Sequence, residues 1–328
     1  MKAIAAEQYG QPEDVLRLTE VAKPTPKDNE VLVKIHAVSL NSADWRLLTA
    51  DPFLVRLEFG LQKPKRPILG SDIAGTVEAV GRDVKAFKAG DAVFGDLSGC
   101  GLGGFAEYVA VPEHVLALKP ARLSFEETAA LPMGSVTALQ ALRDKGGLQA
   151  GEHVLIHGAS GGVGSFSVQI AKALGAHVTA VCSTRHIETV RRLGADQVID
   201  YTREDFAASG QQYDLIVGVN GARSIFDYKR ALKPQGRYVM VGGTSKQIFQ
   251  AMLLGSIVSG GGKKLSGLLQ KFNAGDLQTI AAMVEAGKIA PLMDKCYDGL
   301  AQIPAALRAF GEGHTSGKIV ITVAGAWA

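Results

Sequence analysis

The sequence predicts an α/β protein in which a parallel-sheet domain is inserted into a domain of short strands. From residue 123 to about 288, apolar strands alternate with helical patterns across glycine-rich turns, whereas residues 1–122 show short strands between turn signals. Strands that alternate with helices call for a parallel sheet covered on both faces. The last forty residues, 289–328, return to the first style, so we expect them to complete the N-terminal domain.

The N-terminal region is predicted to contain strands that are buried on one face. In "EVLVKIHAVSL" (30–40), Val31, Val33, Ile35 and Ala37 share one face of a predicted strand, and the residues between them share the other. The stretches "LGSDIAGTVEAVG" and "GDAVFGDL" follow the same style and are punctuated by glycines. We therefore expect a sheet that packs on a core with one of its faces.

The central region is predicted to supply five or six strands with helices between them, the sixth being the stretch 264–269. One helical pattern, "FSVQIAKALGA", is closed by Gly175 as a C-cap. Because these strands are short apolar runs bounded by glycines, they are typical of a sheet that is buried on both faces. The predicted strands are 153–158, 177–182, 197–200, 214–219, 237–242 and 264–269.

The composition is that of a globular protein large enough for two domains. The chain has 328 residues, of which 47% are hydrophobic and 20% charged. A net charge of +3 is too small to indicate a nucleic-acid partner. The three cysteines lie far apart and are odd in number, which argues against a disulfide framework and against a zinc cluster.

Neither a signal peptide nor a membrane-spanning segment is predicted. The N-terminus turns polar at Glu7 before an apolar region develops, so we expect a cytoplasmic protein. The apolar run 248–260 is too short to span a bilayer. Residues 251–265 combine apolar side chains with glycines and two lysines, which predicts a helix followed by a turn or, alternatively, a membrane-surface patch.

The stretch "VLIHGASGGVG" (154–164) predicts a phosphate-binding turn. It follows a predicted strand, opens a predicted helix, and places Gly158, Gly161 and Gly164 at even spacing. Without a Cβ the backbone can approach a pyrophosphate, and the N–H groups at the helix N-terminus attract its charge. The alternative is a glycine-rich turn that holds no ligand.

The end of the next predicted strand favours NADPH over NADH. An NAD site usually carries Asp or Glu about twenty residues after the glycine turn. The stretch "VCSTRH" instead offers Ser183, Thr184 and Arg185. A guanidinium suits a 2′-phosphate because its planar fork matches phosphate oxygens. The alternative is that Arg185 is a solvated residue at the start of a helix.

A set of motifs along the whole chain resembles a known family. They begin with residues Pro67, Gly70, Asp72, Gly75, Val77, Val80, Gly81, Gly90 and Asp91 and continue with "GGFAEYVAVP", "GASGGVG" and "LGADQVIDY". This pattern resembles the medium-chain dehydrogenase/reductase superfamily, in its zinc-free quinone oxidoreductase (zeta-crystallin-like) branch. The resemblance implies a GroES-like β-barrel catalytic domain (1–122 and 289–328), a doubly wound Rossmann domain (123–288), a cleft that holds NADPH, and a homodimer.

The resemblance also implies which residues contact the cofactor. Asn41 would face the nicotinamide, although Ser42 stands where the family usually has Pro. Lys318 is a further candidate, although Ser316 departs from the pattern nearby. The other implied cofactor contacts are Thr137, Ser160, Gly161, Gly162, Val163, Ser183, Arg185, Tyr201, Asn220, Gly242, Gly243 and Thr244.

No metal site is predicted. Zinc alcohol dehydrogenases of this superfamily carry a Cys, a His and a Cys at the positions that resemblance assigns to Asn41, Ser71 and Met133. None of these three is a credible zinc ligand, since zinc prefers thiolate, imidazole or carboxylate. His36 lies near this region, but a single His without partners is typical of a packed or solvated strand residue.

Without a Lewis acid, the acceptor must be activated already. A metal ion supplies several kcal/mol of charge stabilisation to an oxyanion. Quinones and α,β-unsaturated carbonyls such as 2-alkenals spread that charge by conjugation, so the protein needs only positioning and hydrogen-bond donors. We expect the amide of Asn41 to be such a donor; alternatively, Asn41 is a polar turn residue that caps "ADWRLL". No side chain stands out as proton donor, so we expect solvent to protonate the product.

The sequence therefore predicts an NADPH-dependent reductase of quinones or enones. One alternative is a zinc-free alcohol or ketone dehydrogenase, and another is an NADPH-binding sensor or structural protein with little turnover. The apolar stretch "FLVRLEFGL" (53–61) either covers the substrate site or forms an ordinary packing helix.

Overall fold

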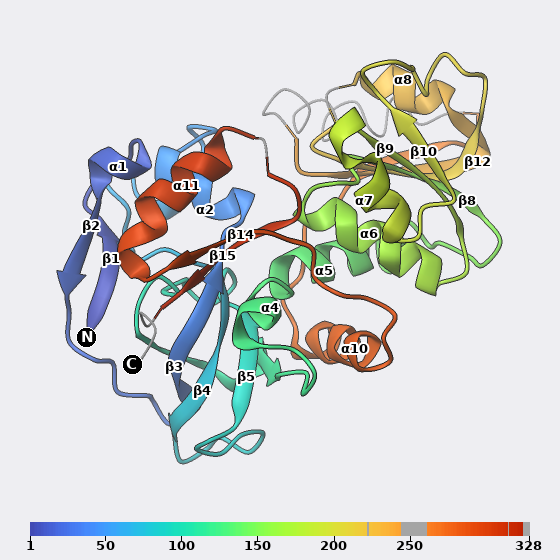
Figure 1. Ribbon diagram of the computed structural model, residues 1–328. Coiled ribbons are helices and arrows are strands. Elements are labelled where there is room, and N and C mark those ends of the chain that lie inside the picture. Colours follow the sequence, from blue (N-terminus) through green and yellow to red (C-terminus); the bar gives the residue numbers. More distant parts are fainter. Residues whose placement is uncertain (222, 244–260, 314, 324–328) are drawn as a thin grey trace. The chain divides into compact units, whose positions relative to one another are not determined.

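The computed structural model describes residues 1–221, 223–243, 261–313 and 315–323 (Figure 1). The chain forms two compact units. The first consists of Met1–Met133, Phe272–Ala286 and Pro291–Ala328, and the second of Gly134–Lys271 and Gly287–Ala290. The predicted α/β architecture, with a strand-rich unit and a parallel-sheet unit, is confirmed.

The first unit is built on a seven-stranded sheet. Its strand order is β14-β15-β3-β4-β5-β7, and β6 pairs with β3. A separate antiparallel pair is formed by β1 and β2. The bounds are β1 Lys2–Ala6, β2 Leu16–Glu20, β3 Glu30–Ser39, β4 Asp72–Val80, β5 Ala92–Asp96, β6 Tyr108–Pro112, β7 Leu116–Leu118, β14 Met293–Asp298 and β15 Lys318–Thr322.

Strand β3 is more deeply buried than its sequence alternation predicts. Leu32, on the face expected to be open, is only 5% exposed. Helix α4 (Phe125–Ala129) packs on β3 and β4 from that side, and the rings of His36 and Phe125 lie 4.3 Å apart. The predicted buried face is confirmed, since Val31, Val33, Ile35 and Ala37 are all buried. The opposite face is more covered than expected, with Leu32 buried and Lys34 and His36 half-buried, because a helix distant in sequence packs on it.

The C-terminal strand returns to the first unit. β15 pairs antiparallel with β3, and Val320 lies opposite Ser39. The unit also contains α4, which packs on β3 and β4, and α10, which packs on β7. The predicted domain boundaries at residues 122 and 289 assign both helices to the other domain. The helices of this unit besides α4 are α1 Pro12–Val15, α2 Ser42–Thr49, α3 Val55–Phe59, α10 Ala274–Glu285 and α11 Ile303–Gly311.

The second unit holds a six-stranded parallel sheet. Its order is β10-β9-β8-β11-β12-β13, and all six predicted strands are confirmed. This is the Rossmann order. The first three strands of the chain are added toward one edge of the sheet, and the fourth strand lies on the other side of the first. The bounds are β8 His153–His157, β9 His177–Cys182, β10 Gln197–Asp200, β11 Tyr213–Val219, β12 Leu232–Val241 and β13 Lys264–Gly267, with α5 Pro132–Leu139, α6 Gly162–Ala173, α7 Ile187–Arg192 and α8 Ile225–Arg230.

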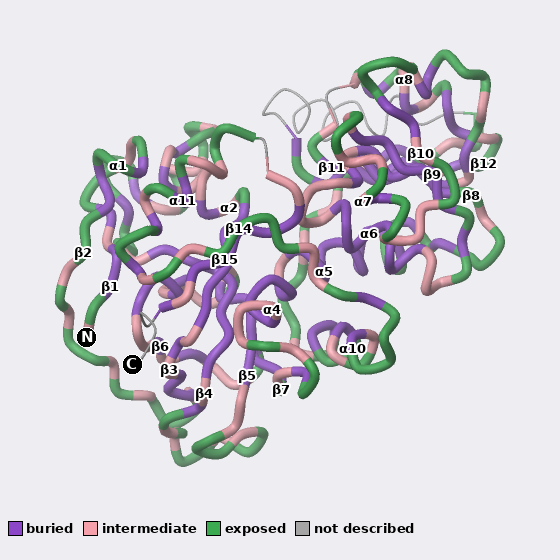
Figure 2. Tube along the Cα trace, viewed as in Figure 1, coloured by how far each residue is buried: buried purple, intermediate pink, exposed green. Residues whose placement is uncertain are grey.

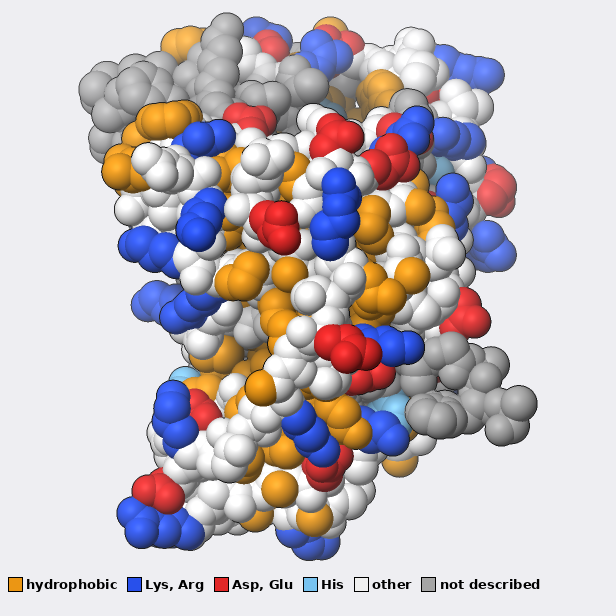
Figure 3. All heavy atoms as spheres, turned by 90° about the vertical axis from the view of Figure 1, so that its left-hand side faces the viewer, with side chains coloured by type: hydrophobic (Ala, Val, Ile, Leu, Met, Phe, Trp, Pro, Cys, Tyr) orange, Lys and Arg blue, Asp and Glu red, His pale blue; other side chains and the backbone are white. Residues whose placement is uncertain are grey.

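Buried strands form the core of each unit, as the purple tube in Figure 2 shows. Lysine and arginine side chains are interspersed with acidic ones on the face drawn in Figure 3. Within the described ranges, every helix is too short or too polar to cross a membrane. Residues 251–260, part of the segment considered as a membrane-surface patch, lie outside the described residues.

Candidate active site

Packing of the protein itself requires two of the three glycines in the turn after β8. Gly158 has φ +81°, and a Cβ built there would lie 2.2 Å from the carbonyl oxygen of Val219. A Cβ on Gly164 would lie 2.0 Å from the carbonyl oxygen of Gly158. These glycines therefore form the tight turn and let α6 pack closely on the strand, as in dinucleotide-binding folds.

The middle glycine is not required by internal packing. Gly161 has φ −80°, and a Cβ there would meet only the carbonyl oxygen of Gly158, at 3.7 Å. Gly161 is the N-cap of α6, where the N–H groups of the first turn have no partner within the helix. Ser160 to Val163 are partly exposed. This open backbone fits a phosphate group that approaches the helix N-terminus.

The other predicted cofactor residues follow the carboxyl ends of neighbouring strands. Ser183 and Arg185 follow β9, Tyr201 follows β10, and Asn220 follows β11. Gly242 and Gly243 follow β12, and a Cβ on Gly242 would lie 2.9 Å from Asn220 Oδ1. Because carboxyl ends of parallel strands share one edge, the structure brings these residues together where such sheets bind ligands. Thr244 lies outside the described residues.

One carboxylate near this edge was missed by the sequence analysis. Asp200, the last residue of β10, lies opposite Cys182 of β9. Its carboxylate accepts hydrogen bonds from the hydroxyl groups of Thr184 and Thr202, and Arg203 lies 3.6 Å away. The hydrogen bond from Thr184 is the main cause that lowers the pKa of Asp200. The sequence signal for this acid was the strand end "VID". It places the carboxylate at the end of β10, one strand later than the position where an NAD site usually carries it.

Thr137 makes a contact that the sequence did not predict. It is 8% exposed, and its hydroxyl donates to Gln270 Oε1 at 2.7 Å. In the next turn, Gln140 Nε2 donates to the carbonyl of Lys271, and Gln140 Oε1 accepts from the N–H of Lys271. The Thr137 hydroxyl proton is therefore committed to a neighbouring side chain of the same unit.

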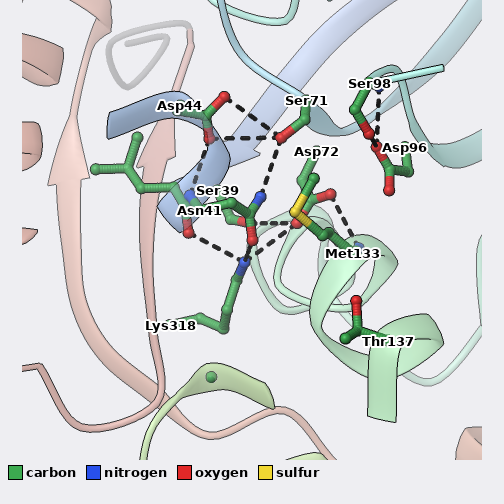
Figure 4. Close-up of polar contacts among 12 residues, drawn as sticks. Ser39, Asn41, Asp44, Ser71, Asp72, Asp96, Ser98, Met133, Thr137 and Lys318 are labelled. Atoms are coloured by element: carbon green, nitrogen blue, oxygen red, sulfur yellow. Dashed lines mark hydrogen bonds and ion pairs between the residues drawn. The ribbon is translucent and has the colours of Figure 1, made fainter. Parts of the chain in front are cut away.

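In the first unit, the three positions aligned with zinc ligands lie in one cluster (Figure 4), in which Met133 is half-buried. Asn41 stands at the N-cap of α2, and its Nδ2 donates to Ser71 Oγ at 3.1 Å. Met133 donates its backbone N–H to Asp72 Oδ1 at 3.0 Å. Asn41 is 7% exposed and Ser71 is fully buried.

Lys318, the first residue of β15, is the cation of this cluster. Its Nζ donates to Asn41 Oδ1, to the carbonyl oxygen of Leu40 at 3.1 Å and to Asp72 Oδ2 at 3.1 Å. An ammonium group has three N–H donors, so these acceptors satisfy it completely. Its protons are thus used within the first unit, and the suggested role of Lys318 as a cofactor contact stays a prediction.

Asp44 is a fully buried acid of this cluster. Its carboxylate accepts the backbone N–H of Asn41 at 2.9 Å, and Ser71 Oγ lies 3.4 Å from both of its oxygens. Burial is the main cause that raises the pKa of Asp44 to about 7, and the charge of Asp72 raises it further. Asp44 therefore changes charge near neutral pH.

The residues at this position do not fit a zinc ion. Amide, hydroxyl and thioether groups are poor zinc ligands. In addition, the ammonium of Lys318 already bonds Asn41 and Asp72, and a second cation beside it would be repelled. Among the described residues no group of three His, Cys, Asp or Glu side chains could hold a metal ion.

The resemblance pointed to Asn41, Ser71 and Met133, and it included Asp72 and Lys318 without indicating that their charges lie beside Asn41. Asp72 and Lys318 each begin an apolar strand, in "SDIAG" and "GKIVI". A charged residue at the start of a buried strand is a signal, since such residues are rarely buried unless they are paired. The sequence did not show that these two pair with each other.

The apolar stretch 53–61 contains the short helix α3, and apolar side chains are exposed both in this helix and beside it. Phe53, Leu54, Leu57 and Leu61 all have exposed side chains. Phe59 of the same helix packs against the core of the first unit, so both interpretations of this stretch stay open.

Comparison with known proteins gives matches along nearly the whole chain. The alcohol dehydrogenase GroES-like domain matches residues 27–121, and the zinc-binding dehydrogenase domain matches residues 193–321. The chain is 35% identical over 333 residues to the chloroplast envelope quinone oxidoreductase homolog of Arabidopsis thaliana, with 98% of each covered. It is 35% identical over 358 residues to the mitochondrial NAD(P)H oxidoreductase RTN4IP1 of Bos taurus, with 98% of this chain and 89% of that protein covered. The solved quinone oxidoreductase of Coxiella burnetii has a TM-score of 0.88 at 31% identity, with 98% of this chain and 99% of that chain covered.

Proposed function

Because the chain belongs to the medium-chain dehydrogenase/reductase superfamily, with quinone oxidoreductases among its relatives, we propose that it reduces quinones or enones with NADPH. The family makes it an oxidoreductase that uses a nicotinamide cofactor. The choice of NADPH, the acceptor and the residues that act on it are the proposal.

The second unit is proposed to bind the cofactor. The open backbone at Gly161 supports a pyrophosphate at the N-terminus of α6. The exposed guanidinium of Arg185 supports recognition of a 2′-phosphate. The carboxylate of Asp200 does not argue against a 2′-phosphate, because Thr184, Thr202 and Arg203 already contact it.

The observation that carries the proposed reaction is the hydrogen bonding of Asn41. Its carboxamide nitrogen has two N–H groups, and within the described residues one of them donates to Ser71. The second N–H is proposed to donate to the acceptor oxygen, where negative charge develops as hydride arrives at the conjugated carbon. The reduced nicotinamide supplies that hydride when bound. The proton that completes the product is proposed to come from solvent.

The experiment follows NADPH absorbance with menadione, crotonaldehyde and butyraldehyde as acceptors. We expect turnover with menadione or crotonaldehyde and little with butyraldehyde, which lacks the conjugated double bond. Faster turnover of butyraldehyde would favour the carbonyl dehydrogenase. NADPH binding without oxidation by any acceptor would favour the sensor.

Variants at Asn41 test its assigned role. Asn41→Ala is expected to lower kcat about 100-fold, as removal of an oxyanion donor does in other enzymes. Asn29→Ala, in an exposed turn, is the matched control and should leave turnover unchanged. Unchanged turnover in Asn41→Ala would remove this residue from the proposal.

A homodimer and a cytoplasmic location belong to the same proposal. Light scattering coupled to size exclusion would give about twice the chain mass of 34.5 kDa for a dimer. Fractionation of the source cells tests the location.

A further inference from the structure

The carboxamide of Asn41 is held in one orientation by a charged neighbour. Lys318 Nζ contacts Asn41 Oδ1, and an ammonium group has donors but no acceptor. The oxygen of the carboxamide must therefore face Lys318, and the nitrogen must face away from it. Figure 4 shows the nitrogen turned toward Ser71.

Ser71 and Asp44 hold the other end of the amide. Ser71 Oγ accepts from Asn41 Nδ2 at 3.1 Å, and its own hydroxyl proton can be donated to Asp44 at 3.4 Å. Asp44 in turn accepts the backbone N–H of Asn41 at 2.9 Å. The side chain and backbone of Asn41 are thus fixed together, and the remaining N–H has a defined direction.

The positive charge of Lys318 is not fully compensated by Asp72, because the Asp72 carboxylate also accepts hydrogen bonds from other donors. Asp72 accepts the Ser39 hydroxyl at 2.9 Å and the Met133 N–H at 3.0 Å, besides Lys318 at 3.1 Å. Lys318 therefore remains an effective cation toward Asn41 Oδ1. A cation bonded to a carbonyl oxygen polarises the amide and makes its N–H groups stronger donors.

We propose that Lys318 is a positioning residue that orients and polarises the Asn41 amide, in place of the electrostatic role that zinc has in related alcohol dehydrogenases. The inference rests on the proposed function, in which Asn41 donates to the developing oxyanion. Lys318 acts through Asn41, because its three protons are used by Leu40, Asn41 and Asp72.

The kinetic test compares Lys318→Met with Lys318→Arg and with a control. Lys318→Met is expected to lower kcat for menadione about tenfold, with the KM for NADPH changed by less than about twofold. Lys318→Arg keeps the charge and should retain more activity than Lys318→Met. Lys295→Met, at an exposed lysine of the adjacent strand β14, is the matched control. A rise in the KM for NADPH without a fall in kcat would overturn the proposal in favour of a cofactor contact.

A second measurement does not depend on turnover. The chain contains four asparagines, so selective ¹⁵N labelling gives few side-chain amide signals, and Asn41→Ala assigns the one of interest. Lys318→Met is expected to shift that signal and broaden it, because the amide can then rotate. An unchanged Asn41 signal in Lys318→Met would overturn the proposal.

A double variant allows the same test if the single variant does not fold. If Lys318→Met alone does not fold, Lys318→Met with Asp72→Asn removes both buried charges together. This pair is expected to fold and to show the same tenfold loss of kcat; full activity would overturn the inference. If the wild-type protein reduces none of the acceptors, the proposed function fails, while the amide signal still decides whether Lys318 orients Asn41.

Discussion

Lys318 Nζ lies 3.1 Å from Asp72 Oδ2, and the two side chains are 3% and 0% exposed. Such burial removes both charges from water, a cost that only good geometry and further hydrogen bonds offset. Here Ser39 and Met133 donate to Asp72, while Leu40 and Asn41 accept from Lys318. The pair is thus part of a closed network beside the candidate catalytic amide.

Removal of one member of this pair should destabilise the first unit strongly. Asp72→Asn leaves the Lys318 ammonium buried without its counter-charge, and we expect a loss of about 3–5 kcal/mol of unfolding free energy. Urea unfolding followed by circular dichroism measures it. Glu13→Gln, which breaks the exposed ion pair with Arg308 at a similar distance of 3.0 Å, should change stability far less. Equal losses in the two variants would contradict a special role for burial.

The stability of the protein should depend on pH through Asp44. Burial raises its pKa to about 7 in the folded state; the charges of Asp72 and Asp96 raise it too, while the Asn41 N–H and Lys318 lower it. The folded state therefore binds the proton more tightly than the unfolded state. This contribution is complete below about pH 4 and is lost as pH rises toward 7, by about 4 kcal/mol.

The variant Asp44→Asn isolates this contribution. Because asparagine does not titrate, the fall in unfolding free energy between about pH 4 and pH 7 should be smaller in the variant than in the wild type. Chemical unfolding at a series of pH values measures the difference. Parallel profiles would show that Asp44 keeps an ordinary pKa.

Two glycines of the turn after β8 should respond differently to alanine. In Gly164→Ala the new Cβ would lie 2.0 Å from the carbonyl oxygen of Gly158, so α6 must move, at a cost of about 1–3 kcal/mol or more. In Gly161→Ala the Cβ has room, so stability should hold while the Kd for NADPH rises about tenfold. Thermal unfolding and fluorescence titration separate the two effects. Tight NADPH binding by a stable Gly161→Ala would contradict the predicted phosphate site.

Arg185 should determine the preference of the enzyme for NADPH over NADH. Arg185→Ala removes the guanidinium proposed for the 2′-phosphate, so kcat/KM for NADPH should fall about tenfold while that for NADH stays the same. Arg192→Ala, at an exposed arginine of α7, is the control. Equal losses with both cofactors would show that Arg185 does not read the 2′-phosphate.

Much of the second unit could be predicted because its signals are local. Each predicted strand is a short apolar run, and all of them appear within a few residues of the expected bounds. The turn at Gly158 could also be predicted, since a left-handed residue and a close approach both require glycine. By contrast, the acid at Asp200 was overlooked because its approach to Thr184 depends on how β9 and β10 pair.

The sequence by itself determined the two kinds of sheet and the glycine turn, and its resemblance to a known family implied that Asn41, Ser71 and Met133 replace zinc ligands. Only the tertiary structure decided what surrounds Asn41. Ser39 pairs with Asp72 on one side of β3 and with Val320 on the other, which brings Lys318 to Asp72 across 246 positions of the chain. Strand register fixes that meeting, and this register joins β3 to two strands that are distant from each other in the chain, so no single stretch of sequence shows it.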